Sequence, residues 1–257
     1  MALGFSAFLF AQAGRQGAAK AGTVPDLSGV WGGKPNRQAA LRNRISRGEV
    51  KVPLGYLNHE TGDAGSLMDE PYPMKPWAKE AFVYNRIPPG TYGYAGVGRN
   101  ELRPDLANCF PLGPTRTWSA FEFIQSPSRV LMFIQEDNEI RQFWIDGREH
   151  PKDFGHTWMG HSIGHWEGDV LVVDTIGLND KTWLDSAGHV HTDALHLTER
   201  LRRVDHDTMT LDMTIDDPKA YTKPFTVHKT FALKPKMELE ENILCEDHLD
   251  GDPVPLH

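Results

Sequence analysis

The residues with the clearest capacity for chemistry lie in one histidine-rich part of the chain. Seven of the twelve histidines fall between positions 150 and 196, namely His150, His156, His161, His165, His189, His191 and His196. Because imidazole titrates near neutral pH and binds transition metals, this enrichment predicts either proton transfer or metal ligation. The alternative is a solvated loop that contains histidines without using them.

Two acidic residues interrupt rows of apolar residues in predicted strands. Alternate residues of a strand share one side of a sheet, so Glu199 lies on a row with two leucines and Asp174 on a row with two valines. A carboxylate on a core-facing row must be paired, protonated or in a polar cavity. The structural alternative is an internal salt bridge from either residue to Arg200, Arg202 or Arg203.

These observations predict a site for general acid–base catalysis. Desolvated carboxylates beside histidines can bring pKa values close to the working pH. We expect His161, His191 and His196 to act as acid–base groups, with Asp174 and Glu199 orienting or tuning them.

A metal site is the second possibility for the same histidines. His189 and His191 are two residues apart, and His196 or Asp185 could complete a ligand set for zinc, copper or iron. A helical His-x-x-x-His motif is absent from the sequence, and the two cysteines are too far apart for a cysteine-based zinc cluster. We therefore expect no metal and no other cofactor.

Aromatic side chains could form the walls of a substrate site, although most aromatic residues simply belong to the core. The candidates for substrate binding are Trp144, Trp158, Trp166, Trp183 and Tyr221. Ser162 lies in a Gly-His-Ser-Ile-Gly sequence that superficially matches the nucleophile elbow of hydrolases. That elbow needs a strand, a turn and a helix, whereas a hairpin is predicted here, which argues against a serine hydrolase.

The elements that must position these residues are predicted to be strands. After Pro114, runs of six to ten residues alternate with turn-forming residues, which is typical of an antiparallel sandwich or barrel. The predicted strands cover residues 117–125, 129–136, 139–146, 162–166, 170–175, 196–204, 208–215, 225–233 and 238–246. The predicted fold is all-β and mainly antiparallel, a β-barrel with an irregular N-terminal extension containing short helices.

The N-terminal part of the chain is rich in glycine and proline and has little periodic apolar surface. Residues 14–114 are predicted to wrap around the barrel of residues 115–257 as one domain. This wrap contains a predicted strand at residues 26–31 and predicted helices at residues 37–47 and 75–84.

Residues 1–13 form an apolar run ending in Ala11-Gln12-Ala13, which has the small-x-small form that signal peptidases recognise. The run predicts the remnant of a signal peptide and a secreted or periplasmic protein, with a frayed apolar terminus as the alternative. In an exported chain, Cys109 and Cys245 could form a disulfide, although spacing alone cannot establish it.

The net charge of the chain indicates which kinds of binding partner to expect. With 27 Lys and Arg against 35 Asp and Glu, the net charge is −8. This charge argues against nucleic acid and anionic membranes and favours a small neutral or cationic ligand.

A long motif runs through the histidine-rich part of the chain, Gly160-His-Ser-Ile-Gly-His-Trp-Glu-Gly-Asp-Val-Leu-Val-Val-Asp-Thr-Ile-Gly177, which matches GHSIGxWEGDxLVVDT. On this motif the chain resembles a family of secreted, largely uncharacterised β proteins of environmental bacteria. The resemblance extends to residues 109–114, 146–148, 182–185, 198–200 and 215–218. It implies a shared fold and export, and it assigns no catalytic residue.

The sequence Gly29-Val-Trp31, followed by consecutive strands, also resembles the calycin group of lipocalin-type barrels. That resemblance implies a cavity for one small apolar molecule. The leading prediction is an exported barrel enzyme that binds such a molecule and performs a lyase, isomerase or hydrolase reaction. The alternatives are a carrier of a hydrophobic compound, a His-ligated metal-dependent enzyme and a structural envelope protein.

Overall fold

The computed structural model describes residues 24–33, 67, 71–85 and 104–241 of the 257-residue chain. The elements are β1 (Gly29–Gly33), α2 (Pro76–Asn85), α3 (Pro104–Ala107), β2 (Ala120–Gln125), β3 (Arg129–Ile134), β4 (Ile140–Trp144), β5 (His161–Glu167), β6 (Val170–Ile176), β7 (His196–Asp205), β8 (Thr208–Asp216) and β9 (Phe225–Leu233). None of the described helices is long and apolar enough to span a membrane.

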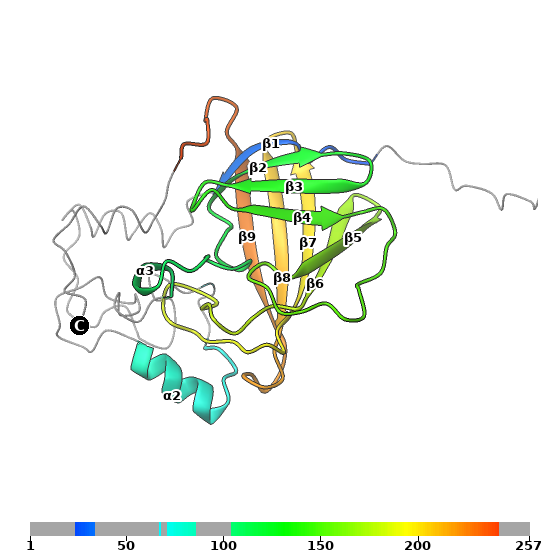
Figure 1. The fold of residues 1–257 in the computed structure, drawn as a ribbon. Helices are drawn as coiled ribbons and strands as arrows, with labels where there is room; N and C mark the ends of the chain where they lie inside the picture. The colour runs from blue at the N-terminus through cyan, green and yellow to red at the C-terminus, as the bar shows by residue number, and fades with distance from the viewer. Residues whose placement is uncertain (1–23, 34–66, 68–70, 86–103, 242–257) are drawn as a thin grey trace, which may run out of the picture.

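Nine strands of the described chain close into a barrel in sequence order (Figure 1). Neighbouring strands pair antiparallel, except that β4 pairs parallel with β5, where Phe143 is opposite Ser162. The barrel closes at β1, since Trp31 is opposite Phe121 on one side and Leu233 on the other. The predicted all-β, mainly antiparallel barrel is therefore confirmed.

The structure differs from the predicted list of barrel strands at two places. Eight predicted strands correspond to β2–β9, but residues 238–241 are not in a strand, so the described part of that prediction is wrong. The ninth strand is β1, from the predicted strand at residues 26–31. β9 pairs with β8 on one side and with β1 on the other. A strand after Leu233 would therefore find no unpaired edge on β9.

The N-terminal segment that was expected to wrap around the barrel thus contributes one of the barrel strands, β1. The barrel runs from Gly29 to Leu233 rather than starting at residue 115. The helix expected at residues 75–84 is present as α2, while the short α3 was not predicted. The helix expected at residues 37–47 and the signal-peptide segment 1–13 lie outside the described residues.

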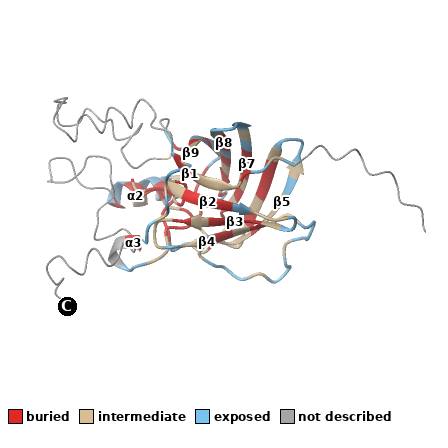
Figure 2. Ribbon diagram, turned by 90° about the horizontal axis from the view of Figure 1, so that it is seen from above, coloured by how far each residue is buried: buried red, intermediate tan, exposed pale blue. Residues whose placement is uncertain are grey.

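The strand interiors follow the alternation that the sequence predicts, and Figure 2 shows the buried residues along the barrel wall. Five aromatic rings pack together inside the barrel, with adjacent ring centroids 5.0–6.2 Å apart; they belong to Trp118, Phe121, Phe123, Phe143 and Phe231. Apolar burial of this kind supplies most of the free energy of folding.

A second buried cluster lies where the β6–β7 connection meets the segment around α2. Asp185 accepts hydrogen bonds from the Tyr72 hydroxyl at 2.8 Å and from His189 Nδ1 at 2.8 Å. The His189 ring is sandwiched between the rings of Tyr72 at 3.6 Å and Phe82 at 3.9 Å. These contacts tie α2 to the β6–β7 connection, on the side of the barrel away from β1 (Figure 1).

Candidate active site

Four titratable side chains meet on the outer face of the barrel over β5, β6 and β7. His196 Nε2 lies 2.5 and 2.9 Å from the two oxygens of Asp174. His150 Nε2 lies 3.4 Å from Asp174 Oδ2, and His150 Nδ1 lies 2.8 Å from His161 Nδ1. We call these four residues the outer cluster; it contains three of the five predicted catalytic residues.

Strand parity places the outer cluster outside the barrel. Ser162, Thr175 and Leu197 are buried and point inward, so the residues beside them in sequence point outward. Ser162 is opposite Thr175, and Thr175 is opposite Leu197, so the three positions are level across the sheet. His161 and His196 therefore lie close to the same level, with Asp174 on the strand between them.

The connection from β4 to β5 brings His150 to the cluster. Phe154, in the same connection, packs its ring 5.1 Å from the His161 ring. Gly177 lets that ring approach, because a Cβ at position 177 would lie 2.5 Å from it. Gly160 and Gly177 have φ angles of 67° and 70°, a backbone conformation that residues with a Cβ rarely adopt. The glycines flanking β5 and β6 thus shape the cluster.

The ionisation of Asp174 and His196 is coupled. Burial favours the neutral acid, yet the hydrogen bond and charge of His196, followed by those of His150, hold the pKa of Asp174 below its usual value. The hydrogen bond to Asp174 raises the pKa of His196, against the opposing effect of burial, and the charges of Asp174 and Asp216 add to the increase. The pair therefore favours a carboxylate beside an imidazolium.

The pKa of His161 is shifted in the opposite direction to that of His196. Partial burial lowers the pKa of His161, and the nearby charges of His150 and Arg148 lower it further. The pKa values of two histidines in one cluster therefore differ in opposite directions. The neutral form is favoured for His161 and the protonated form for His196. Opposed shifts of this kind are the usual mark of an acid and a base with separate roles.

The hydrogen bonds also assign the protons. A carboxylate only accepts, so His150 Nε2 donates to Asp174, which leaves His150 Nδ1 to accept from His161 Nδ1–H. This arrangement leaves His161 Nε2 as a lone-pair acceptor. In the imidazolium form, His196 donates to Asp174 from Nε2 and carries a second proton on Nδ1. Neither His161 Nε2 nor His196 Nδ1 has a partner in the part of the chain that the structure describes.

A surface hollow lies at the same end of β5 and β6. It has a volume of about 470 Å³ and is lined by His156, Thr157, Trp158, Asn179, Asp180, Lys181 and Asp193. Thr157 pairs with Leu178 immediately beyond the strand ends that carry the cluster. The Trp158 ring packs 4.7 Å from Phe110, with the Lys181 amine 5.8 Å from its centroid. The hollow thus offers an aromatic wall and both signs of charge.

Glu199 lies on the inner face, apart from the outer cluster. Its side chain is fully buried, as its row predicted, and its oxygens accept hydrogen bonds from Arg141 at 3.0 and 2.7 Å. The salt bridge considered from the sequence therefore exists, but its partner is Arg141 on β4 rather than a neighbour on β7. Arg141 also approaches the hydroxyl of Thr175, at 3.4 Å.

His191 is also separate from the outer cluster. It is buried in the β6–β7 connection, accepts a hydrogen bond from the Thr182 hydroxyl at Nε2 and donates from Nδ1 to the Thr192 carbonyl. Burial lowers the pKa of His191, against the raising effects of the Thr192 carbonyl and nearby carboxylates. Because both ring nitrogens are used, this histidine holds the connection together.

The residues considered as a metal-binding set do not meet. His189 contacts Asp185, His191 contacts Thr182 and His196 contacts Asp174. Among the residues that the structure describes, no group of three or more His, Cys, Asp or Glu side chains has the arrangement of a metal site.

The five predicted aromatic residues have different environments. Trp158 lines the hollow beside the outer cluster, and Trp166 lines a second hollow of about 680 Å³. Trp183 and Tyr221 are buried, and the Tyr221 hydroxyl donates to the Val190 carbonyl. Trp144 stacks against the Arg148 guanidinium at 3.5 Å. Trp158 therefore lines the hollow beyond the ends of β5 and β6, and Trp144 lies against Arg148, whose charge acts on His161.

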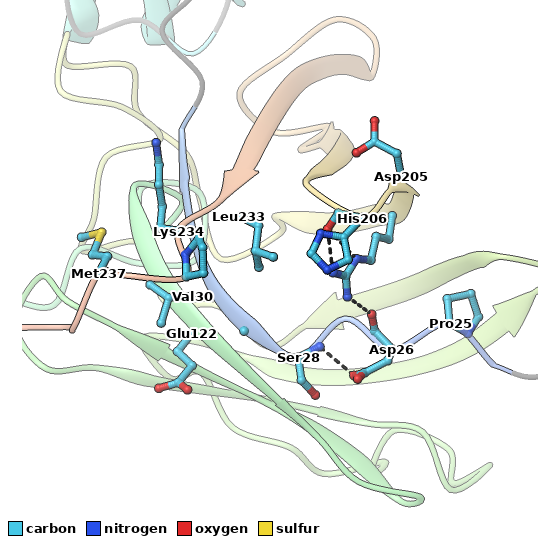
Figure 3. A pocket seen from close by; sticks show the side chains of 13 residues that line it. Pro25, Asp26, Ser28, Val30, Glu122, Asp205, His206, Leu233, Lys234 and Met237 are labelled. Atoms are coloured by element: carbon cyan, nitrogen blue, oxygen red, sulfur yellow. Dashed lines mark hydrogen bonds between the residues drawn. The ribbon is translucent and has the colours of Figure 1, made fainter.

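A wider groove follows the seam between β1 and β9 and is drawn in Figure 3. Its volume is about 820 Å³, and it is open to solvent. Arg203 in this groove already donates to the carbonyls of Asp26 and His206 and lies 5.2 Å from the Trp31 ring. The groove is lined by none of the predicted site residues, so the outer cluster remains the candidate active site.

Sequence reasoning missed two residues that contact the predicted ones, His150 beside Asp174 and Arg141 beside Glu199. His150 belonged to the histidine-rich stretch, but it follows β4 in a connection whose path parity cannot give. Arg141 shares the inward row of β4 with buried Phe143, so it is a charged residue on a core-facing row, as Glu199 is. Applying that signal to cations as well as to carboxylates finds Arg141.

Comparison of the chain with protein-family models, curated proteins and solved structures found no match. The resemblances to the secreted bacterial family and to the calycins therefore stay predictions. The same holds for the disulfide, because Cys245 lies outside the described residues.

Proposed function

We propose that the protein is an acid–base enzyme whose active site is the outer cluster. The observation that carries this proposal is the hydrogen-bonded chain from His161 through His150 and Asp174 to His196. In this chain, burial lowers the pKa of His161 and the hydrogen bond to Asp174 raises the pKa of His196. His161 Nε2 accepts a proton from the substrate, and His196 Nδ1 donates one to the group that gains negative charge. Asp174 holds His196 in its protonated form and links the two histidines through His150.

The substrate of this reaction is a small, largely apolar organic molecule bound in the hollow beside the cluster. The Trp158 ring supplies an apolar wall, and Lys181 is available to a polar substituent. The reaction class is a lyase or isomerase step at a carbon acid, or a hydrolysis. Each of these reactions can use one base and one acid: the base takes a proton from the substrate carbon, or from water in a hydrolysis, and the acid protonates the group that gains negative charge.

Proton transfer from carbon can be detected before the product is known. Purified protein in D₂O is incubated with a panel of small apolar ketones and esters, and NMR follows deuterium incorporation and ester cleavage. We expect turnover of at least one compound, lost in His161→Gln and in Asp174→Asn. His165→Gln is the matched control, because His165 lies on the same outward row of β5 but pairs with Glu167.

An inactive wild-type protein on both parts of the panel contradicts the proposal, as does full activity of His161→Gln. A second outer-face pair gives a further control, since His228 Nδ1 lies 2.7 Å from Asp212, and no second histidine of the described residues contacts this pair. His228→Gln is expected to retain full activity.

Export of the protein is proposed from the apolar run ending at Ala13. The test is mass spectrometry of the protein recovered from the periplasm or the medium of an expressing bacterium. A mature chain that begins after Ala13 supports export, and an uncleaved chain confined to the cytoplasm contradicts it.

A further inference from the structure

Three side-chain oxygens beside the β3–β4 turn lack a hydrogen-bond donor. They are the two carboxyl oxygens of Glu139 and the amide oxygen of Gln135, and all three are buried. Buried acceptors are almost always paired, because an unpaired one costs the free energy of its desolvation. Two such side chains at one turn therefore point to donors that the described part of the chain does not supply.

A pocket of about 370 Å³ lies against both side chains. Its walls come from the end of β3, from the β3–β4 turn and from the segment after β9, which can be followed in Figure 1. Phe133 and Leu239 give the pocket apolar surface, and Glu240 and Glu241 add carboxylates. None of the five aromatic rings packed inside the barrel lines it. The pocket is therefore at the rim of the barrel and not in its interior.

The unpaired oxygens can reach this pocket. Glu139 and Gln135 both line it and both keep an intermediate exposure, although their oxygens are covered. The last torsion angle of a glutamate or glutamine side chain has a broad energy minimum, so the terminal oxygens turn at little cost in free energy. A donor in the pocket is therefore reached by rotation of these end groups, without movement of the backbone.

The charge in and around the pocket is negative. Glu240 and Glu241 line it together with Glu139, whereas no lysine, arginine or histidine among the described residues does. Glu136 and Asp137 precede Glu139 on the same turn, and the charges of both act on its carboxyl group. Such surroundings attract a cation and repel an anion.

The neighbouring chain compensates the charge of Glu139 only weakly. Arg116 is the cation whose charge acts on Glu139, but its Nη1 and Nη2 already donate to Asp105 at 2.7 and 3.0 Å. Burial, followed by the charge of Asp137, raises the pKa of Glu139 to about 7. The Leu112 backbone N–H and Arg116 lower this pKa, but the N–H lies outside hydrogen-bond geometry. The carboxyl group is thus near the midpoint of its titration at neutral pH.

The kind of cation follows from the lining. Among the described residues, no group of three or more His, Cys, Asp or Glu side chains has the arrangement of a metal site, which argues against a bare metal ion. A primary ammonium ion carries three N–H donors and one positive charge, so it matches both the unpaired oxygens and the negative surroundings. The apolar side chains of Phe133 and Leu239 suit a ligand with a hydrocarbon part.

We propose that this pocket binds a small organic ammonium ion, whose N–H groups donate to Glu139 and Gln135. The net charge of −8, from which a neutral or cationic ligand is expected, favours the approach of this ligand to the protein. The pocket shares no residue with the outer cluster or with the hollow beside it. The proposal is therefore independent of the acid–base activity.

Binding of an ammonium ion at Glu139 must release protons. The bound cation stabilises the carboxylate of Glu139 and so lowers the pKa of this group from about 7. At pH 7, each binding event therefore gives a fraction of a proton to the buffer, and the affinity falls as the pH is lowered further. A neutral ligand in the same pocket would release none.

The experiment is calorimetric titration of the full chain at pH 7 with butylamine and with benzylamine, in two buffers of different ionisation enthalpy. We expect saturable binding of at least one amine with proton release, weakened about tenfold or more in Glu139→Gln. Glu238→Gln is the matched control, because Glu238 is an exposed residue of the same segment that does not line the pocket, and it should bind as the wild type does. Benzyl alcohol, the neutral counterpart of benzylamine, should bind about tenfold more weakly or worse.

A stability measurement separates loss of the site from misfolding. Without ligand, Glu139→Gln should have a Tm at pH 8 that is no lower than that of the wild type, because it removes an unpaired buried carboxylate. A lower Tm shows that Glu139 has a stabilising partner in the chain and overturns the proposal. Failure of the wild type to bind either amine, equal binding by Glu139→Gln, binding without proton release, or tighter binding of calcium chloride than of both amines would also overturn it.

Discussion

Asp174 and Glu199 lie on neighbouring strands, one position apart in register, and point to opposite sides of the same barrel wall. Glu199 is opposite Val173, whereas Asp174 is opposite Thr198. Asp174 is partly exposed and binds two histidines, while Glu199 is fully buried and binds Arg141. A single sequence signal, an acidic residue on an apolar row, therefore corresponds to a partly exposed histidine cluster in one case and to an internal ion pair in the other.

Glu199→Gln should destabilise the fold strongly. The substitution leaves Arg141 as an uncompensated charge in the barrel interior, and breaking a buried pair in this way costs about 3–5 kcal/mol. Urea unfolding followed by tryptophan fluorescence gives the change in free energy of unfolding. Glu167→Gln removes the exposed pair with Arg200 and should cost less than about 1 kcal/mol. Equal losses in the two variants would contradict the structural role of Glu199.

The same ion pair predicts non-additive substitutions. Arg141→Met combined with Glu199→Leu removes both charges, so no uncompensated charge remains. We expect the double variant to be more stable in urea than either single variant. A double variant whose loss equals the sum of the single losses would show that the two side chains act independently.

Gly160→Ala should disturb both stability and the outer cluster. A Cβ at position 160 would lie 2.6 Å from the carbonyl oxygen of Ile176, at a φ of 67°. Gly168→Ala is the matched control, since its φ is 63° but no atom lies within 4 Å of the added Cβ. The control should lose about 1–2 kcal/mol from backbone strain alone, and Gly160→Ala should lose more in thermal unfolding. Equal losses would mean that the close contact at Ile176 relaxes freely.

Much of this fold follows from local sequence patterns. The alternation of Met209, Leu211 and Met213 fixes β8 and its inward face, and Gly168 marks the hairpin between β5 and β6. Closure of the barrel is different, because the pairing of Trp31 with Leu233 joins residues from opposite ends of the described barrel. No local periodicity encodes that contact, so β1 could be recognised as a strand but not as the closing one.

The candidate site shows the same limit. Strand parity and shared rows identify Asp174 and Glu199, but parity alone cannot say which side of the wall is the interior at each level. The approach of His150 to Asp174 depends on the path of a connection that contains no regular element. Residues on strands were therefore predictable as candidates, whereas their grouping required the three-dimensional structure.

His191 should make the fold less stable in mild acid. Its pKa is lowered in the folded protein, chiefly by burial, so the unfolded chain binds more protons as the pH falls below about 6.5. The stabilising contribution is present above that pH and is lost as the pH falls toward the folded-state pKa. His191→Gln should flatten the dependence of the unfolding free energy between about pH 5 and pH 7. An unchanged slope would contradict the assignment of His191 as a neutral buried group.

The outer cluster can be tested directly by NMR titration of the imidazole rings of His161 and His196. The account predicts that His196 titrates above the usual pKa of histidine and His161 below it. Asp174→Asn should lower the pKa of His196 toward its usual value, while His165→Gln should leave both titrations unchanged. Titration of both histidines at one ordinary pKa, or no response of His196 to Asp174→Asn, would contradict the assignment of an acid and a base in this cluster.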